Sequence, residues 1–152
     1  APMTVITLTA EIAVSPHQVY DYVTRPVRWK EWHPASQGVT DVDDESLVAG
    51  RRFEEDVLSV GRKRHLTWLV EESRPGERWR ASAYMADGST VRLTYDMVGS
   101  GNGTRFTRTL EYTLRPVLLR WLNDLFLWKR VRAESEKALA NLCARLSGAQ
   151  AA

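Results

Sequence analysis

Apolar and polar residues alternate along residues 5–14, and such alternation predicts a half-buried β-strand. The residues on its apolar face are Ile6, Leu8, Ala10, Ile12 and Val14. Similar segments follow later in the chain, separated by turn sequences such as SVGR, SRPGE, ADGS and GSGNG. They predict strands at approximately 38–44, 51–58, 63–72, 77–86, 90–98 and 104–114. Because the turns are short, the pattern indicates an antiparallel meander.

Two short helices are expected between the first two strands. In the stretch SPHQ, Ser15 is a suitable N-cap, Pro16 fits the first helical position and Gln18 completes a capping box. Pro26 ends this helix and begins a second one, which Pro34 stops.

The second short helix carries RPVRWKEWHP, in which Trp29 and Trp32 lie three residues apart and His33 follows directly. Residues three apart share a helix face, so both indoles are expected to pack on the same side of this helix. A zinc site at His33 is not favoured, because the three histidines of the chain lack the spacing of paired metal ligands.

A single long helix is expected from Pro116 to about Ser147. One stripe, apolar at both ends and polar in the middle, consists of Trp121, Leu125, Trp128, Arg132, Ser135, Leu139, Leu142 and Leu146. A second apolar patch, turned away from the first, consists of Leu118, Leu119, Leu122 and Phe126, with Arg115, Arg120, Lys129 and Arg130 nearby. The patch has three interpretations: contact with an anionic membrane surface, a dimer interface, or packing against the two short helices. The last is favoured, and a monomer or a homodimer is expected.

The order of elements therefore predicts an α+β fold in which a seven-stranded antiparallel sheet curves around one long helix. A cavity can remain between the sheet and the helix. The length of 152 residues agrees with one domain, placed at residues 4–147, with a short tail at residues 148–152.

The segments EIAVSPHQVYDYVTRPVRWKEWHP, GRRFEE, LTWLVEESRPGERW and GTRFTRTLEYTL, in this order, resemble the START/Bet v allergen-like superfamily, also called SRPBCC or helix-grip. The chain is most similar to its bacterial polyketide cyclase/dehydrase-type branch. The resemblance implies a helix-grip fold with a cavity for a hydrophobic molecule. No cofactor and no metal are expected. It also implies that the two short helices close one end of the sheet. Trp29 and Trp32 would form core there, with direct ligand contact as the alternative.

Strand alternation predicts which side chains face this cavity. The candidate cavity residues, taken from the strands, the helix stripe and the second short helix, are Trp32, Trp68, Trp79, Tyr95, Phe106, Arg108, Tyr112, Trp121, Leu125, Trp128 and Arg132. Glu55 also falls on an inward face. A buried, unpaired charge costs several kcal/mol of stability, which is more than the roughly 1.5–3 kcal/mol that burial of a leucine side chain contributes. A purely structural interpretation of these polar residues is a Glu55–arginine ion pair that joins the sheet to the helix. Alternatively, the predicted strand register is wrong and Arg108 lies in solvent.

The functional interpretation is an apolar pocket with a few convergent polar groups. Arg108 or Arg132 would hold a carbonyl, enolate or carboxylate, and Tyr95 or Tyr112 would donate a phenolic hydrogen bond. The first hypothesis is a binding or carrier protein for a lipid, quinone or polyketide-like molecule. The second is a cyclase or aromatase without a covalent intermediate, for which the candidate catalytic residues are Arg108, Tyr112, Glu55 and Tyr95. The alternative base, His65, is expected to face solvent.

Composition and charge exclude some of the other functional classes of protein. The formal net charge is only +2 and the acidic residues interleave with the basic ones, so nucleic-acid binding is not expected. The glycines of GSGNG lie between two strands and indicate a hairpin, not a phosphate loop. Cys143 is the single cysteine and is expected to be a small core residue; it suits a reducing cytoplasm, as does the lack of a signal-peptide pattern.

Overall fold

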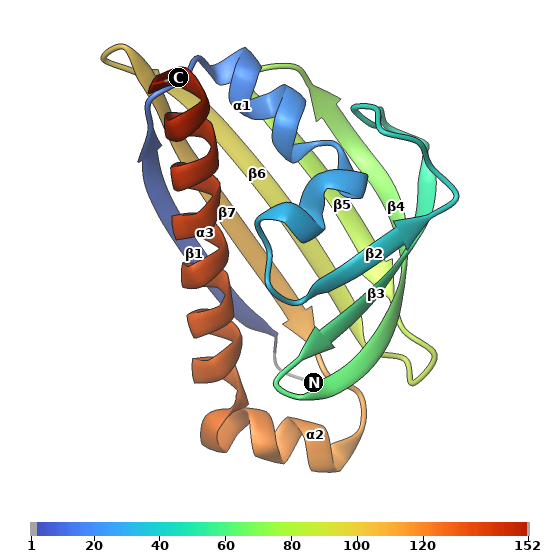
Figure 1. Cartoon of the computed structure of the whole chain (residues 1–152). Helices are drawn as coiled ribbons and strands as arrows, with labels where there is room; N and C mark the ends of the chain where they lie inside the picture. The colour runs from blue at the N-terminus through green and yellow to red at the C-terminus, as the bar shows by residue number, and fades with distance from the viewer. Residues whose placement is uncertain (1–2, 152) are drawn as a thin grey trace.

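The chain folds as a seven-stranded antiparallel sheet that curves around helices, as Figure 1 shows in a computed structural model. The structure describes the backbone of residues 3–151 and the side chains of residues 3–147. The strands are β1 (Thr4–Ile12), β2 (Ser36–Thr40), β3 (Arg52–Ser59), β4 (Arg62–Arg74), β5 (Arg78–Tyr84), β6 (Thr90–Ser100) and β7 (Gly103–Thr113). Their spatial order is β1-β7-β6-β5-β4-β3-β2, so the meander predicted from the turns is confirmed and β1 pairs with its last strand.

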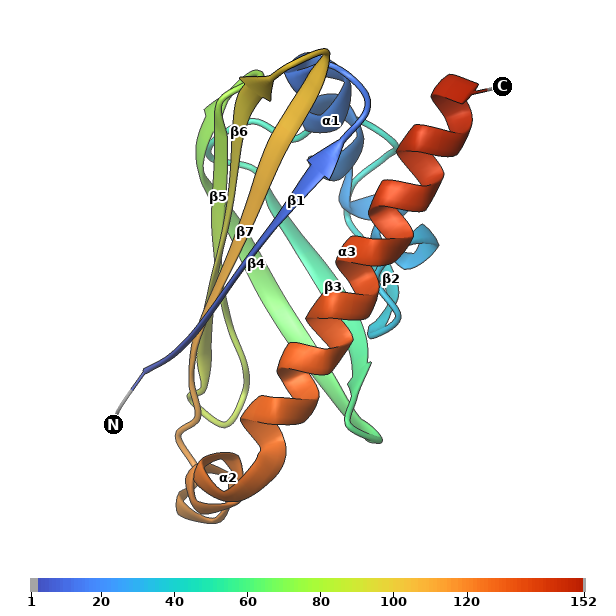
Figure 2. The same ribbon diagram turned by 90° about the vertical axis from the view of Figure 1, so that its left-hand side faces the viewer.

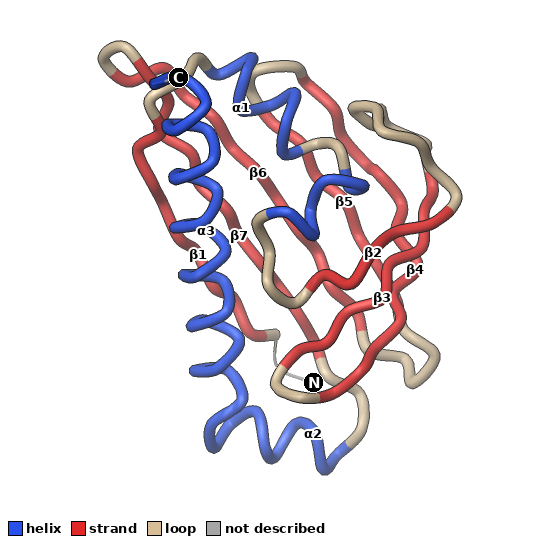
Figure 3. Tube along the Cα trace, viewed as in Figure 1, coloured by secondary structure: helices blue, strands red, loops and turns tan. Residues whose placement is uncertain are grey.

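Most of the helices lie on one side of the sheet, and the segment 117–122 lies across its end, as Figures 2 and 3 show. The helices are α1 (Pro16–Val23), the 3-10 helix η1 (Pro26–Glu31), α2 (Val117–Leu122), the π-helical turn η2 (Asn123–Leu127) and α3 (Trp128–Ala151). None of the helices within the described residues is long and apolar enough to cross a bilayer. The expected helix-grip fold is confirmed.

The start of α1 follows directly from its sequence. The Ser15 side chain accepts a hydrogen bond from the Gln18 backbone amide, and the Gln18 side chain accepts one from the Ser15 amide. This is the predicted capping box, and Pro16 stands at the first turn. The local sequence therefore fixes where the chain leaves β1 and turns back over the sheet.

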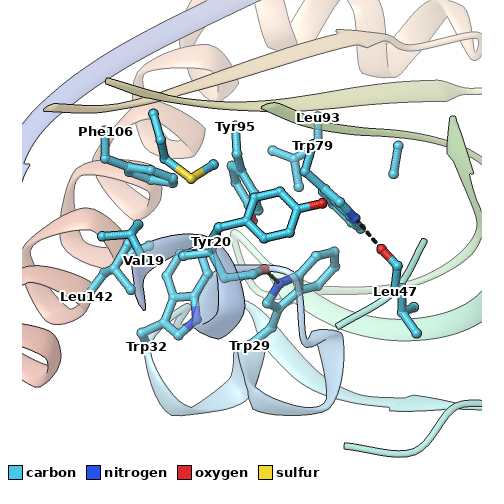
Figure 4. Close-up of a cluster of buried hydrophobic side chains, with 14 of the residues drawn as sticks. Val19, Tyr20, Trp29, Trp32, Leu47, Trp79, Leu93, Tyr95, Phe106 and Leu142 are labelled. Atoms are coloured by element: carbon cyan, nitrogen blue, oxygen red, sulfur yellow. Dashed lines mark hydrogen bonds between the residues drawn. The ribbon is translucent and has the colours of Figure 1, made fainter. Parts of the chain in front are cut away.

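Trp29 and Trp32 are both buried, as Figure 4 shows. Trp29 packs edge-on against Trp68 and Trp79, with ring centroids 5.7 and 5.9 Å away, and its indole N–H donates to the Val23 carbonyl. The aromatic cluster is the core of the closed end, where α1 and η1 meet the sheet. Both tryptophans are therefore buried at the closed end, and both also lie at the wall of the cavity described below.

The C-terminal helical segment differs from the prediction, because it is not straight. In Figures 1 and 2, α2 runs across the end of the molecule and α3 turns sharply away from it, with η2 at the corner. A π-helical turn inserts one residue relative to an α-helix and shifts which side chains face inward. The stripe predicted from regular helical spacing therefore faces inward only from Ser135 onward, where Ser135, Leu139 and Leu142 are buried.

Candidate ligand cavity

A cavity of about 360 Å³ lies between the sheet and the helices, within the size range of small-molecule sites. Its floor is the inner face of β3, β4, β6 and β7, and Trp29 and Trp32 close one end. At the other end, Ser59, Val60 and Arg62 of the β3–β4 hairpin are half-buried or exposed. The cavity therefore reaches the surface beside this hairpin.

The structure places most of the residues predicted from strand alternation at the cavity wall. The predicted residues that line it are Trp32, Trp68, Tyr95, Arg108 and Tyr112, and Glu55 lies among them. Trp79 and Phe106 are buried as expected, but they belong to the core and do not line the cavity. The Trp79 indole N–H instead donates to the Leu47 carbonyl, because the chain crosses over this part of the sheet.

The helix side of the cavity was predicted wrongly. Trp121, Leu125, Trp128 and Arg132 are exposed, and Arg132 pairs with Glu136 on the surface. The π-helical turn and the bend rotate the helix so that neighbouring positions face inward. The lining residues from this segment are Leu119, Leu122, Asn123, Leu127, Val131, Glu134 and Ser135.

Glu55 is a buried carboxylate, 5% exposed, that lines the cavity without a cationic partner. It accepts hydrogen bonds from the Ser36 hydroxyl at 2.7 Å and from the Trp68 indole N–H at 3.0 Å. A β-bulge between Ser36 and Gly38 in β2 brings the Ser36 side chain to the inner face. No described arginine forms an ion pair with Glu55, so the ion pair that would join the sheet to the helix is not present. Burial raises the pKa of Glu55 to about 7.

Arg108 reaches from β7 toward α3 and is also 5% exposed, so the alternative that placed it in solvent is wrong. Its Nη1 donates to the Ser135 hydroxyl at 2.9 Å. Its Nε–H, like the Trp32 indole N–H, has no hydrogen-bond partner among the described residues. Two residues that line the cavity thus each carry a buried N–H donor without an acceptor from the described protein.

His33 is the cavity residue whose environment the sequence did not indicate. It lies half-buried after η1, and its Nδ1 accepts a hydrogen bond from the Ala35 amide at 3.1 Å. Burial, and then the charge of Arg108, lower the pKa of His33 to about 3. The imidazole is therefore neutral at physiological pH, and its Nε2 carries the proton.

The two candidate tyrosines have different surroundings. Tyr112 donates to the Asn123 side chain at 2.6 Å, and Asn123 in turn donates to Thr4, which ties the corner to β7 and β1. Tyr95 is fully enclosed, and burial raises its pKa well above the usual range. The alternation of apolar and polar residues along the strands predicted both tyrosines as cavity residues. Asn123 and Ser135 lie in the C-terminal helical segment, and the sequence did not identify them as cavity residues.

The remaining titratable candidate lies outside the cavity. His65 is exposed on the outer face of the sheet and contacts Asp56 and Glu54, each at 2.8 Å, as expected from its parity. No three His, Cys, Asp or Glu side chains of the described residues are arranged to hold a metal ion. The charged side chains that line the cavity are therefore Glu55 and Arg108 in its interior, with Arg62, Arg64 and Glu134 nearer the β3–β4 hairpin.

A model of the family described as "Polyketide cyclase / dehydrase and lipid transport" matches residues 3–147. Among proteins with curated functions, none matches the sequence significantly.

Three solved structures share the fold. A protein from Thermus thermophilus, TTHA0849, has a TM-score of 0.78 at 20% identity, with 96% of this chain and 99% of that chain covered. The protein Ara h 8.0201 has a TM-score of 0.67 at 9% identity, covering 95% and 98%. DynU16, described as a putative protein in the dynemicin biosynthetic locus, has a TM-score of 0.66 at 15% identity, covering 93% of this chain and 46% of that chain.

Proposed function

The chain belongs to the polyketide cyclase/dehydrase and lipid transport family, within the helix-grip superfamily, and on this premise we propose that it binds a hydrophobic small molecule in its cavity. The ligand would be of lipid, quinone or polyketide-like chemistry, mostly apolar and with an oxygen at one end. The cavity supports this, because its wall is largely aliphatic and aromatic, with a few polar groups between them.

The observation that carries the proposal is the pair of buried N–H donors without a protein acceptor, Arg108 Nε and Trp32 Nε1. An unsatisfied buried donor costs about 1–3 kcal/mol, and more for a charged group. A ligand carbonyl, carboxylate or phenolate oxygen would remove this cost on binding. Its apolar body would then extend along Leu66, Leu93 and Leu110 toward the hairpin.

A second candidate function, cyclisation or dehydration of a polyketide-like substrate, is favoured by Glu55. A buried carboxyl whose pKa is about 7 can take up a proton at neutral pH. It would remove a proton from a carbon next to a carbonyl, while Arg108 stabilises the enolate oxygen. The carbanion would form a bond to a second carbonyl carbon, and the protonated Glu55 would return its proton to the resulting alkoxide.

The first experiment is native mass spectrometry of the protein from its own host, followed by solvent extraction. We expect a bound apolar molecule with an oxygen function in stoichiometric amount. Cyclised product, or a mixture of open and cyclised chains, would favour the enzyme. A protein that carries nothing and binds no fatty acid, quinone or polyketide-like probe would contradict the proposal.

The polar end of the site is tested by Trp32→Phe, which removes one donor and keeps an aromatic ring. Loss of one hydrogen bond should weaken ligand binding by about 5- to 10-fold. Arg108→Met should weaken it further. Arg105→Met is the matched control, because Arg105 lies on the same strand but is exposed and pairs with Glu11. Equal binding by Arg108→Met and Arg105→Met would exclude Arg108 from the site.

A further inference from the structure

The outer surface of the corner formed by α2, η2 and the start of α3 is unusually apolar. Its large exposed side chains, here called the corner surface, are Val117, Leu118, Trp121, Leu125, Phe126 and Trp128. They are between 37% and 70% exposed, and they make up half of the exposed large apolar residues within the described chain. The others are scattered over strands and loops. A cluster of this kind on an otherwise ordinary surface marks an interaction site.

The charges around the corner surface are strongly biased. Residues 115–132 contain five basic residues and one acidic residue, whereas the formal net charge of the whole chain is only +2. Arg120, Lys129 and Arg130 form no ion pair with any described residue. At the α1 end, by contrast, Arg25 and Arg28 are both paired with acidic side chains. The positive charge of the corner is therefore available to a partner.

The position of the corner excludes the interpretation that its apolar residues pack against the two short helices. α2 lies at the end of the molecule opposite α1 (Figures 1 and 2). The second apolar patch predicted from the sequence had four residues. Of these, only Leu119 and Leu122 face inward, where they line the cavity. The corner surface is thus the outside of the cavity wall that these two leucines form.

We propose that the corner surface docks onto an anionic lipid bilayer. Trp121, Leu125 and Phe126 would enter the boundary between headgroups and acyl chains, where apolar and indole side chains are favoured. Lys129 and Arg130 follow directly and would contact lipid phosphates. Each cation close to an anionic leaflet strengthens binding several-fold.

A second copy of the chain fits the corner surface less well. In a two-fold dimer the same surface meets itself, so Arg120, Lys129 and Arg130 would approach their own copies. Within the segment, only Asp124 could compensate this repulsion. An anionic bilayer satisfies both the apolar and the basic side chains at once. Docking depends on the outer face of the corner alone and not on what occupies the cavity.

The test is cosedimentation of the purified full-length protein with vesicles of phosphatidylcholine, with and without about 30% phosphatidylglycerol. We expect at least about 10-fold stronger binding to the anionic vesicles, and a loss of this difference at about 0.5 M salt, where charges are screened. Absence of binding to either vesicle would overturn the proposal.

Two double variants separate the apolar from the electrostatic contribution. Trp121→Ser with Leu125→Ser should lower binding to anionic vesicles by at least about 10-fold, and so should Lys129→Glu with Arg130→Glu. Val98→Ser and Lys30→Glu are the matched controls, since both side chains are exposed and lie away from the corner. Circular dichroism verifies that all variants are folded.

Binding that the corner variants do not weaken more than the controls would place the membrane contact elsewhere and reject the corner surface. Sedimentation velocity provides the competing outcome. A dimer that Trp121→Ser with Leu125→Ser dissociates, in a protein that binds no vesicles, would show that the surface mediates self-association instead.

Discussion

Glu55 is a buried carboxyl group without a cationic partner among the described residues, so it titrates near neutral pH. Its two oxygens accept hydrogen bonds from Ser36 and Trp68, which are neutral donors, and no described cation pairs with it. Neutral donors stabilise a carboxylate less than an arginine would, so burial dominates and its pKa is about 7. The folded protein therefore retains a proton that the unfolded chain releases near pH 4.5.

This proton uptake makes stability depend on pH in a defined direction. Because the pKa of Glu55 is raised on folding, its contribution to stability falls as the pH rises from about 4.5 to about 7. Glu55→Gln removes this loss. We expect the free energy of unfolding of the variant, relative to the parent, to increase by roughly 3 kcal/mol between pH 4.5 and about pH 8.

Urea unfolding at several pH values measures this difference, with Glu77→Gln, an exposed residue of the β4–β5 turn, as the control. The variant must be compared with the parent at each pH, because His33 changes stability with pH in the opposite direction. Its lowered pKa makes the folded protein more stable as the pH rises from about 3 to about 6.5. A pH-independent difference for Glu55→Gln would show that Glu55 titrates normally.

The corner between α2 and α3 is the element that most changes the interpretation of the chain. The spacing of Trp121, Leu125 and Trp128 is that of a regular amphipathic helix, and the sequence alone offers no reason to break it. In the folded protein, Asn123 at the start of η2 bonds to Tyr112 and Thr4. These contacts with β7 and β1 hold the corner against the end of the sheet.

Asn123→Ala tests whether these hydrogen bonds fix the corner. The substitution removes the partner of Tyr112 and of Thr4, and the expected loss of stability is about 1–3 kcal/mol. Asn102→Ala, in the exposed β6–β7 hairpin, should cost less than about 0.5 kcal/mol. Denaturant unfolding of both variants measures the difference, and equal stabilities would show that the corner does not depend on Asn123.

At the scale of the whole molecule, the curved sheet and α3 enclose more space than their side chains fill. α3 crosses the sheet mainly near β1, and η1 covers β2, which leaves the middle of the sheet open to the cavity (Figure 1). The hairpin at its mouth is held to α3 by Glu134, which accepts from the Ser59 hydroxyl and from the Val60 amide. At the closed end, the Asn141 side-chain amide of α3 donates to the Trp32 carbonyl at 3.0 Å, so α3 is held at both ends of the cavity.

A larger side chain in the cavity should weaken ligand binding with little effect on the stability of the fold. Leu110→Trp places a larger side chain into the cavity, so we expect ligand binding to fall by at least about 10-fold. Because the added atoms enter unfilled space, stability should change by less than about 1 kcal/mol, whereas overpacking a filled core costs about 1–3 kcal/mol. Isothermal titration and thermal unfolding measure the two effects. Val98→Trp, on the exposed face of β6, is the control.

The sequence by itself determined the strands, the capped first helix and the inward face of each strand. These features follow from local rules: alternation with a period of two, capping residues and turn residues. Every cavity residue predicted from the sheet is buried, and only Trp79 and Phe106 lie deeper than the cavity wall. The strand pattern is robust because a slip of one residue would expose the whole apolar face.

The tertiary structure decided what no local pattern could. A helix tolerates a π-helical turn without any change in composition, so its effect on Trp121, Leu125, Trp128 and Arg132 appears only once the corner packs against the sheet. The partners of Glu55 and Arg108 likewise come from β2, β4 and α3, far apart in sequence. Whether a buried charge is paired, neutral or open to a ligand depends on such contacts, because electrostatic energy is set by distance and burial.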